Sequence, residues 1–169
     1  MAKIMFDQSV VLIIGASGGL GQAIAQAFSR AGSRLALAGR NAGVLAEQAE
    51  RLGVAAFQAD LTDRESLMRL RDTLLAQYGR VDLVINATGY DVRKSFEVHT
   101  PAELEQSVQV NLLGAMQLTQ VFLPVMPSGV IVHLGGFADG RLAFPYYAAD
   151  SAARAGVASF VEALNRELR

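Results

Sequence analysis

A run of apolar residues followed by closely spaced glycines, VVLIIGASGGLG at Val10–Gly21, constrains this chain more than any other segment. The run Val10–Ile14 is too short for a helix and rich in β-branched residues, which is typical of a strand buried inside a parallel sheet. Gly15 ends the run, three more glycines follow, and a helical pattern begins at Gln22. Glycines at this place let an anion approach free backbone N–H groups at the positive end of the helix dipole. The segment therefore predicts a phosphate-binding turn, with an ordinary tight turn as the alternative.

Strand-like and helical segments alternate along the rest of the chain. The expected strands are Val10–Ile14, Arg34–Ala38, Val54–Gln58, Val81–Ile85 and Val130–Leu134, and the expected helices are Gln22–Ala31, Val44–Leu52, Thr62–Tyr78, Pro101–Phe122 and a last one from about Ala148 to Arg169. Capping patterns at Thr62–Glu65 and Thr100–Glu103 mark two helix starts. This alternation predicts an α/β fold, a doubly wound parallel sheet in the order 3-2-1-4-5 with helices on both faces.

Length and composition fit one domain, residues 1–169, with a sizeable core. The chain is 51% hydrophobic with only 18% charged residues, and its net charge of −1 gives no reason to expect nucleic acid as a partner. No run of about 18 apolar residues predicts a membrane span. The absence of cysteine excludes disulfides, and the N-terminal residues lack a signal-peptide cleavage pattern. We therefore expect a cytoplasmic protein without a membrane partner.

The glycine spacing Gly15-x-x-x-Gly19-x-Gly21 resembles the T-G-x-x-x-G-x-G segment of the short-chain dehydrogenase/reductase family, with Ile14 where threonine is usual. The resemblance implies a Rossmann-like fold, a nicotinamide dinucleotide as partner, and hydride transfer between that cofactor and a small carbonyl or alcohol substrate. The residues of the turn that it assigns to cofactor binding are Gly15, Ser17, Gly18, Gly19, Leu20 and Gly21.

Further segments are similar to the family at matching places. Arg40 follows the second strand, where the resemblance implies a 2′-phosphate contact and hence NADP(H) rather than NAD(H); a solvated loop arginine is the alternative. Asn41 adjoins it. The pair Asp60-Leu61 resembles the family's adenine-binding pair, although Asp60 is also a plausible helix-entry acid. The small loop beside the cofactor has the residues Asn86, Ala87, Thr88 and Gly89.

The catalytic residues are where the resemblance weakens. Asn111 matches the helix asparagine that kinks its helix and holds a proton-relay water. The family's serine position reads Gly135-Gly136, and neither Tyr146 nor Tyr147 has a lysine four residues later. One alignment leaves Tyr147 to donate the proton from one turn upstream. A second, which fits the flanking segments 140–145 and 160–164 better, puts Asp150 at the tyrosine position and Arg154 at the lysine position.

Family members continue beyond the point at which this sequence stops, so the resemblance implies that the C-terminal substrate-binding part is lacking. Without it, Val130–Leu134 becomes an exposed apolar edge strand that needs a cover, and the candidates are an oligomer partner, a separate chain or a missing C-terminal part if the sequence is a fragment. We expect a homo-dimer or homo-tetramer, packed through Pro101–Phe122 and the last helix. His99 and His133 lack partners at metal-ligand spacing and are expected to be structural. Two functions stay open: an NADP(H)-dependent oxidoreductase with an altered proton relay, or an inactive nucleotide-binding module or partner subunit.

Overall fold

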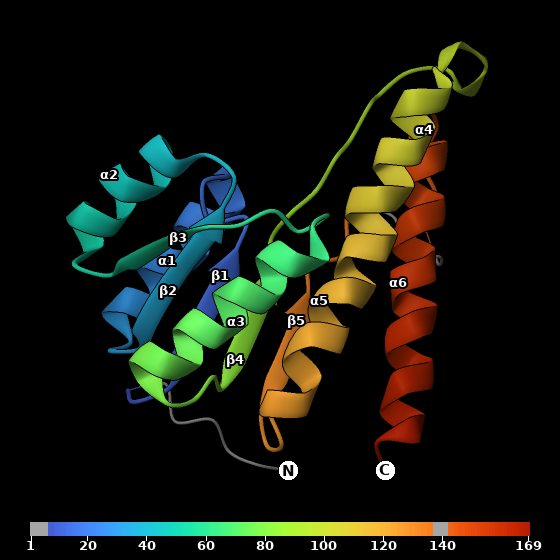
Figure 1. Cartoon of the computed structure of the whole chain (residues 1–169). Helices are drawn as coiled ribbons and strands as arrows, with labels where there is room; N and C mark the ends of the chain where they lie inside the picture. The colour runs from blue at the N-terminus through green and yellow to red at the C-terminus, as the bar shows by residue number, and fades with distance from the viewer. Residues whose placement is uncertain (1–6, 137–141) are drawn as a thin grey trace.

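A computed structural model describes residues 7–136 and 142–169 and consists of a parallel sheet with helices on both faces (Figure 1). The flank expected at 140–145 lies partly outside these residues. The strands are β1 Val10–Ile14, β2 Arg34–Gly39, β3 Ala55–Gln58, β4 Leu83–Asn86 and β5 Val130–His133. The main helices are α1 Gly19–Arg30, α2 Ala42–Leu52, α3 Arg64–Tyr78, α4 Pro101–Val108, α5 Gly114–Phe122 and α6 Ala148–Glu167. Short helical turns lie at η1 Phe96–Val98, η2 Gln109–Leu113 and η3 Leu123–Val125.

The five strands follow the order β3-β2-β1-β4-β5, as the alternation of elements predicts. β1 is fully buried and pairs in parallel with β2 on one side and β4 on the other. Ile14, the last residue of β1, lies opposite Ala38 of β2 and Asn86 of β4. The chain therefore turns away from β1 at the point where the strand order reverses, which is where open α/β sheets form their binding crevice.

Each face of the sheet has its own core. Leu67, Leu70 and Leu74 of α3 pack on one face with Leu118 and Phe122 of α5. On the other face, α1 and α2 cover alternate residues of the same strands and contribute Ala25, Leu45 and Ala49. Since successive side chains of a strand point to opposite faces, β1 supplies both cores, which explains its uninterrupted apolar run.

One helix start differs from the sequence expectation. The pattern at Thr62–Glu65 predicts a capping box from Thr62, but Asp63 caps α3 by accepting a hydrogen bond from Glu65 N (2.9 Å). Thr62 is engaged elsewhere, because its hydroxyl donates to Asp60 Oδ1 (2.8 Å). The second capping box is confirmed: Thr100 and Glu103 bond reciprocally at the start of α4.

The segment expected as one helix, Pro101–Phe122, contains a wide turn. At Gln109–Leu113 the backbone forms a π-helical turn, which separates α4 from α5. Such a turn accommodates one extra residue in a helix and frequently occurs at functional sites. Asn111 lies in it, 2% exposed. The π-turn therefore falls at the asparagine where the resemblance implies a kink.

Among the described residues, the helical stretch Pro101–Val125 is long and apolar enough to cross a membrane by length and composition alone. In the fold, Leu118, Val121 and Phe122 of this stretch are core residues that are at most 1% exposed. The apolar character is therefore used in packing α5 onto the sheet.

α6 lies alongside α4 and the π-turn at the β5 end of the sheet (Figure 1). β5 is an edge strand, and its Val130 and Val132 are exposed. A hollow of about 270 Å³ lies between α5, β5 and the end of α6. The bare edge is thus present as expected, and its cover by a second subunit stays a prediction.

Candidate functional site

The glycine turn after β1 is closely packed against its surroundings. Gly15 has a φ of 84°, and a Cβ built there would lie 2.7 Å from the carbonyl carbon of Ala87. A Cβ on Gly21 would lie 2.3 Å from the Gly15 carbonyl oxygen. These two glycines therefore allow the loop after β4 and the start of α1 to approach the turn. Gly18 caps α1 without a side-chain hydrogen bond, so the N–H groups of the first helical turn are left for another acceptor.

A pocket of about 280 Å³ opens beside this turn, at the carboxyl ends of β1, β2, β3 and β4. Ten of the residues assigned to cofactor binding from the sequence line it: Gly15, Ser17, Gly18, Arg40, Asn41, Asp60, Leu61, Ala87, Thr88 and Gly89. Four others lie outside the lining: Gly19, Leu20, Gly21 and Asn86. Gly21 packs on the turn, and Leu20 is 61% exposed. Asn86 accepts a hydrogen bond from Thr88 N and so supports the loop after β4.

Arg40 and Asp60 follow the adjacent strands β2 and β3, and both line this pocket. Arg40 follows β2 and is exposed, with its backbone carbonyl accepting from Gln58 Nε2 (3.4 Å). Asp60 uses Oδ1 to accept from the N–H and hydroxyl of Thr62 (2.9 and 2.8 Å). Asn41 caps α2 by accepting from Val44 N (3.2 Å). Asp60 and Asn41 thus have local structural roles, and both still face the pocket.

Asn86 fixes the loop on the β4 side. Its Oδ1 accepts from Thr88 N (3.1 Å) and from the Thr88 hydroxyl (2.6 Å). Its Nδ2 lies 3.2 Å from Nδ1 of His133, which is the residue opposite it on β5. Burial lowers the pKa of His133 to about 4, so this ring is neutral at pH 7. His133 is structural in that it supports the loop, and sequence reasoning did not connect it with the site.

A second cluster joins α6 to the π-turn. Asp150 and Arg154 are both buried and form an ion pair, with Arg154 Nε 3.1 Å from Asp150 Oδ1. Asn111 Nδ2 donates to the same Oδ1 (3.1 Å), and also to the carbonyl of Tyr90 (2.8 Å). Arg154 Nη1 donates to the Leu134 carbonyl (3.0 Å). Together with Asn111, the pair therefore links the residue after β5, the π-turn and the segment after β4.

This cluster reaches the places where the resemblance expects chemistry. A Cβ on Gly136 would lie 3.3 Å from Asp150 Oδ2, and one on Gly89 would lie 2.8 Å from Arg154 Nη2. Arg154 therefore adjoins a residue of the pocket lining, and Asp150 faces the position without a hydroxyl. Tyr147 lies one turn earlier, at the start of α6, and is half-buried. The structure brings Asn111 and Arg154 together with Asp150, and the choice between the two alignments stays a prediction.

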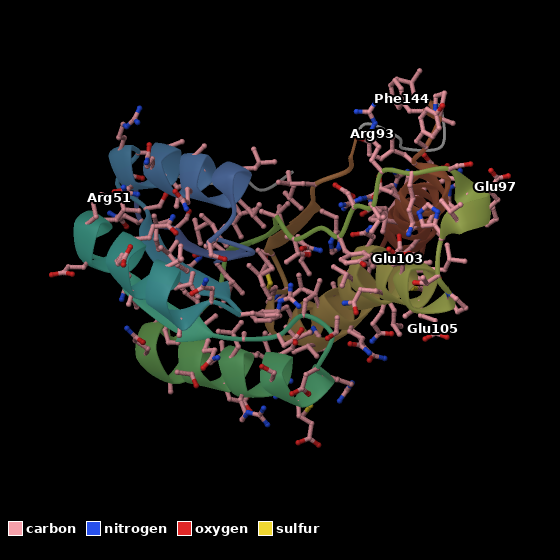
Figure 2. All side chains as sticks on the ribbon, turned by 90° about the horizontal axis from the view of Figure 1, so that it is seen from above. Arg51, Arg93, Glu97, Glu103, Glu105 and Phe144 are labelled. Carbon is pink, nitrogen blue, oxygen red and sulfur yellow. The ribbon has the colours of Figure 1, made fainter. Side chains whose placement is uncertain are left out.

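Asp150 is electrostatically unusual. Burial and the neighbouring Asp91 carboxyl raise the pKa of Asp150 above its ordinary value, while the Arg154 guanidinium opposes them. Asp91 belongs to the segment between β4 and α4, which lies at the same end of the molecule as the start of α6 (Figure 2). Lys94 N donates there to the Tyr146 carbonyl (3.2 Å). A carboxyl whose pKa is raised can retain a proton at a higher pH than an ordinary aspartate.

Sequence reasoning missed part of the pocket wall. Ile14, Gly39, Ala59, Thr62 and Val110 also line it, and their apolar or small side chains carry no motif that would have identified them. Their positions could have done so, since each lies directly beside a predicted site residue in the sequence. Within the described residues, no group of three His, Cys, Asp or Glu side chains could hold a metal ion.

The comparisons with known proteins agree with this geometry. The model of the short chain dehydrogenase family matches residues 9–169. An uncharacterised oxidoreductase of Staphylococcus epidermidis is 28% identical over 176 residues, covering 99% of this chain and 74% of that protein. A dehydrogenase/reductase SDR family protein 7-like of Drosophila melanogaster is 33% identical over 172 residues, covering 94% of this chain and 52% of that protein.

Solved structures are similar over nearly the whole chain. A short chain dehydrogenase/reductase from Burkholderia phymatum in complex with NAD has a TM-score of 0.92 and 26% identity, covering 98% of this chain and 62% of that one. A short-chain dehydrogenase from Streptomyces avermitilis has a TM-score of 0.88 and 32% identity, covering 95% and 61%. The chain spans about half to three quarters of the length of these relatives. Because the family model matches nearly all of it and the fold is shared, the chain belongs to the short-chain dehydrogenase/reductase family of Rossmann-fold oxidoreductases.

Proposed function

We propose that this chain binds a nicotinamide dinucleotide in the pocket at the carboxyl end of the sheet, and that it prefers NADP(H) to NAD(H). The observation that carries the proposal is the pocket itself, where the glycine turn, Arg40 and Asp60 face one space of about 280 Å³. The bound cofactor would supply a hydride donor or acceptor, the chemistry of the family.

The residues present fit such a ligand. The first turn of α1 has N–H groups without a side-chain cap, and these can donate to a diphosphate. Asp60 has one carboxylate oxygen taken by Thr62, which leaves the other for an amino group. The position after β2 has Arg40 and no acid, so it can pair with a 2′-phosphate and lacks the carboxylate that would hydrogen-bond a free 2′-hydroxyl. NAD in the Burkholderia phymatum structure supports the cofactor class.

Binding of NADPH and NADH to the unmodified chain, followed by calorimetry or nucleotide fluorescence, tests this proposal. A charge-assisted contact contributes about 1.5–3 kcal/mol, so Arg40→Ala should reduce the preference for NADPH about tenfold or more. Arg51→Ala is the matched control, because Arg51 is an exposed arginine in the last turn of α2 and is absent from the pocket lining. Equal dissociation constants for the two cofactors in the unmodified chain would contradict the preference.

A second function, nucleotide binding without chemistry, is favoured by the buried ion pair. Asp150 and Arg154 replace the tyrosine and lysine of the better-fitting alignment, and Gly136 offers no hydroxyl. General acid–base catalysis typically supplies 10²–10⁴-fold, so we expect weak or absent carbonyl reduction. Oxidation of NADPH by a panel of ketones and aldehydes measures this. Fast turnover by the unmodified chain that is lost in Tyr147→Phe would instead identify Tyr147 as the proton donor. The chain would then be an active oxidoreductase.

A further inference from the structure

A directed series of hydrogen bonds runs from α5 through β5 to the pocket loop. It consists of Thr119, His133, Asn86 and Thr88, which come from three separate parts of the sequence. Asn86 and Thr119 are 5% and 4% exposed, so they cannot exchange these bonds freely for water. His133 lies between them, with Thr119 Oγ1 2.8 Å from its Nε2 and Asn86 Nδ2 3.2 Å from its Nδ1.

The donors in this series can be assigned from its far end. The Thr119 hydroxyl has one hydrogen and donates it to the Ala115 carbonyl (2.9 Å). Toward His133 it can therefore only accept, so the ring has its hydrogen on Nε2. A neutral ring has one hydrogen, which leaves Nδ1 as a bare acceptor for Asn86 Nδ2. The low pKa of His133 supports this neutral state.

The same logic orients the amide of Asn86. Since its NH₂ group faces His133, its Oδ1 faces Thr88 and accepts both the N–H and the hydroxyl hydrogen of that residue. If His133 lost its acceptor at Nδ1, the Asn86 NH₂ group would lose the partner that the structure gives it, and the present orientation of the amide would be favoured by Thr88 alone. In the reversed orientation, two donors of Thr88 would meet an NH₂ group.

We propose that His133 is a positioning residue of the nucleotide site: by accepting from Asn86, it fixes the amide that holds Thr88 and the loop through Gly89 against the pocket. This inference rests on the proposed function only where it predicts how substitutions of His133 change NADPH binding. It also assigns a polarity to the pocket, because the Thr88 hydroxyl has already donated its hydrogen. Toward a ligand this hydroxyl can only accept, so it selects a hydroxyl or amide donor over a phosphate oxygen.

Two substitutions of His133 separate its acceptor from its bulk. His133→Leu removes the acceptor, while His133→Asn places an amide oxygen near the position of Nδ1 and should rescue it. We expect His133→Leu to weaken NADPH binding about three- to tenfold, the range for one internal hydrogen bond, and His133→Asn to stay within about twofold of the unmodified chain. Equal affinities for the two variants would overturn the proposal.

Thr119→Val tests the far end of the series. It removes the acceptor that fixes the hydrogen on Nε2, so the two neutral forms of the ring should both be populated. Thr73→Val is the matched control, because the Thr73 hydroxyl also donates to a carbonyl four residues earlier, that of Arg69 (2.8 Å), but on the exposed side of α3. Only Thr119→Val should weaken binding.

Nitrogen-15 NMR of the His133 ring and the Thr88 amide gives a measurement that needs no nucleotide. We expect the Nε2–H form in the unmodified chain, and a shift of the Thr88 amide signal in His133→Leu that His133→Asn largely reverses. A ring with its hydrogen on Nδ1, or a Thr88 signal unchanged in His133→Leu, would refute the positioning role. If the unmodified chain fails to bind NADPH, the proposed function is wrong, and this NMR measurement still decides the role of His133.

Discussion

Replacing Gly21 with alanine should separate the start of α1 from the turn after β1. The new Cβ would lie 2.3 Å from the Gly15 carbonyl oxygen and 2.8 Å from the Ala16 Cα. Both are backbone atoms, so no side chain can rotate to relieve the overlap, and α1 has to move. Overpacking of a close-packed site typically costs 1–3 kcal/mol, and we expect the upper end, about 3 kcal/mol.

Gly19 provides a matched control two residues earlier in the same turn. A Cβ there meets nothing within 4 Å, and alanine is favoured over glycine in a helix by up to about 1 kcal/mol. For a chain of 169 residues, 1 kcal/mol corresponds to about 2–4 °C in melting temperature. We therefore expect Gly21→Ala to melt about 6–12 °C below the unmodified chain and Gly19→Ala to melt at or slightly above it.

Thermal unfolding followed by circular dichroism, together with NADPH titration, distinguishes packing from binding at this turn. Gly21→Ala should lose stability and affinity together. If a diphosphate lies on the first turn of α1, Gly19→Ala should lose affinity for NADPH, because its new methyl group would occupy space beside the diphosphate. It should keep its stability, because the methyl group meets no protein atom within 4 Å. Equal melting temperatures for the two variants would refute the assignment of Gly21 to packing.

The remaining predictions concern charged and capping groups. The pKa of His133 falls from 6.5 to about 4 on folding, so the unfolded chain binds more protons than the folded chain between these pH values. The free energy of unfolding should therefore fall by up to about 3 kcal/mol as the pH drops from 6.5 toward 4. Urea titrations at several pH values measure this slope, and His133→Asn should remove most of it. Arg154→Met leaves Asp150 buried without its partner and should cost about 3–5 kcal/mol at pH 7, and less as the pH falls and Asp150 takes up a proton; a cost that does not change with pH would contradict this. Thr100→Ala should cost about 1 kcal/mol through loss of the cap of α4, measured by thermal melting.

The fold was predictable because its signals are local. The buried run Val10–Ile14, its glycine turn and the alternation that follows depend on neighbouring residues in the sequence, and the strand order is that of the Rossmann pattern, built with right-handed crossovers. Helix ends were less predictable where two caps competed. Thr62 and Asp63 can both cap α3, and the contact of Thr62 with Asp60 decides between them.

The parts of the site that sequence could not give depend on long-range packing. Gly114 shows this, because a Cβ there would lie 2.7 Å from Leu61, so α5 approaches the loop after β3 in a way that no periodicity records. The contact between Asn86 and His133 depends on the register of β4 with β5. Asp150 and Arg154 have the spacing of a helical ion pair, but only the fold shows that both are buried against Asn111.

The π-turn at Gln109–Leu113 has a consequence for the phase of the long helix that contains it. One residue adds about 100° of rotation in an α-helix. An extra residue in the π-turn therefore rotates the residues of α4 by that angle relative to the residues of α5. The turn thus contributes to the rotation at which the core side chains Leu118 and Phe122 meet the sheet. Deleting one residue between 109 and 113 would restore a regular helix and rotate one half against the other. In this family member, the spacing between Pro101 and Phe122 is therefore as strongly constrained as the residues within it.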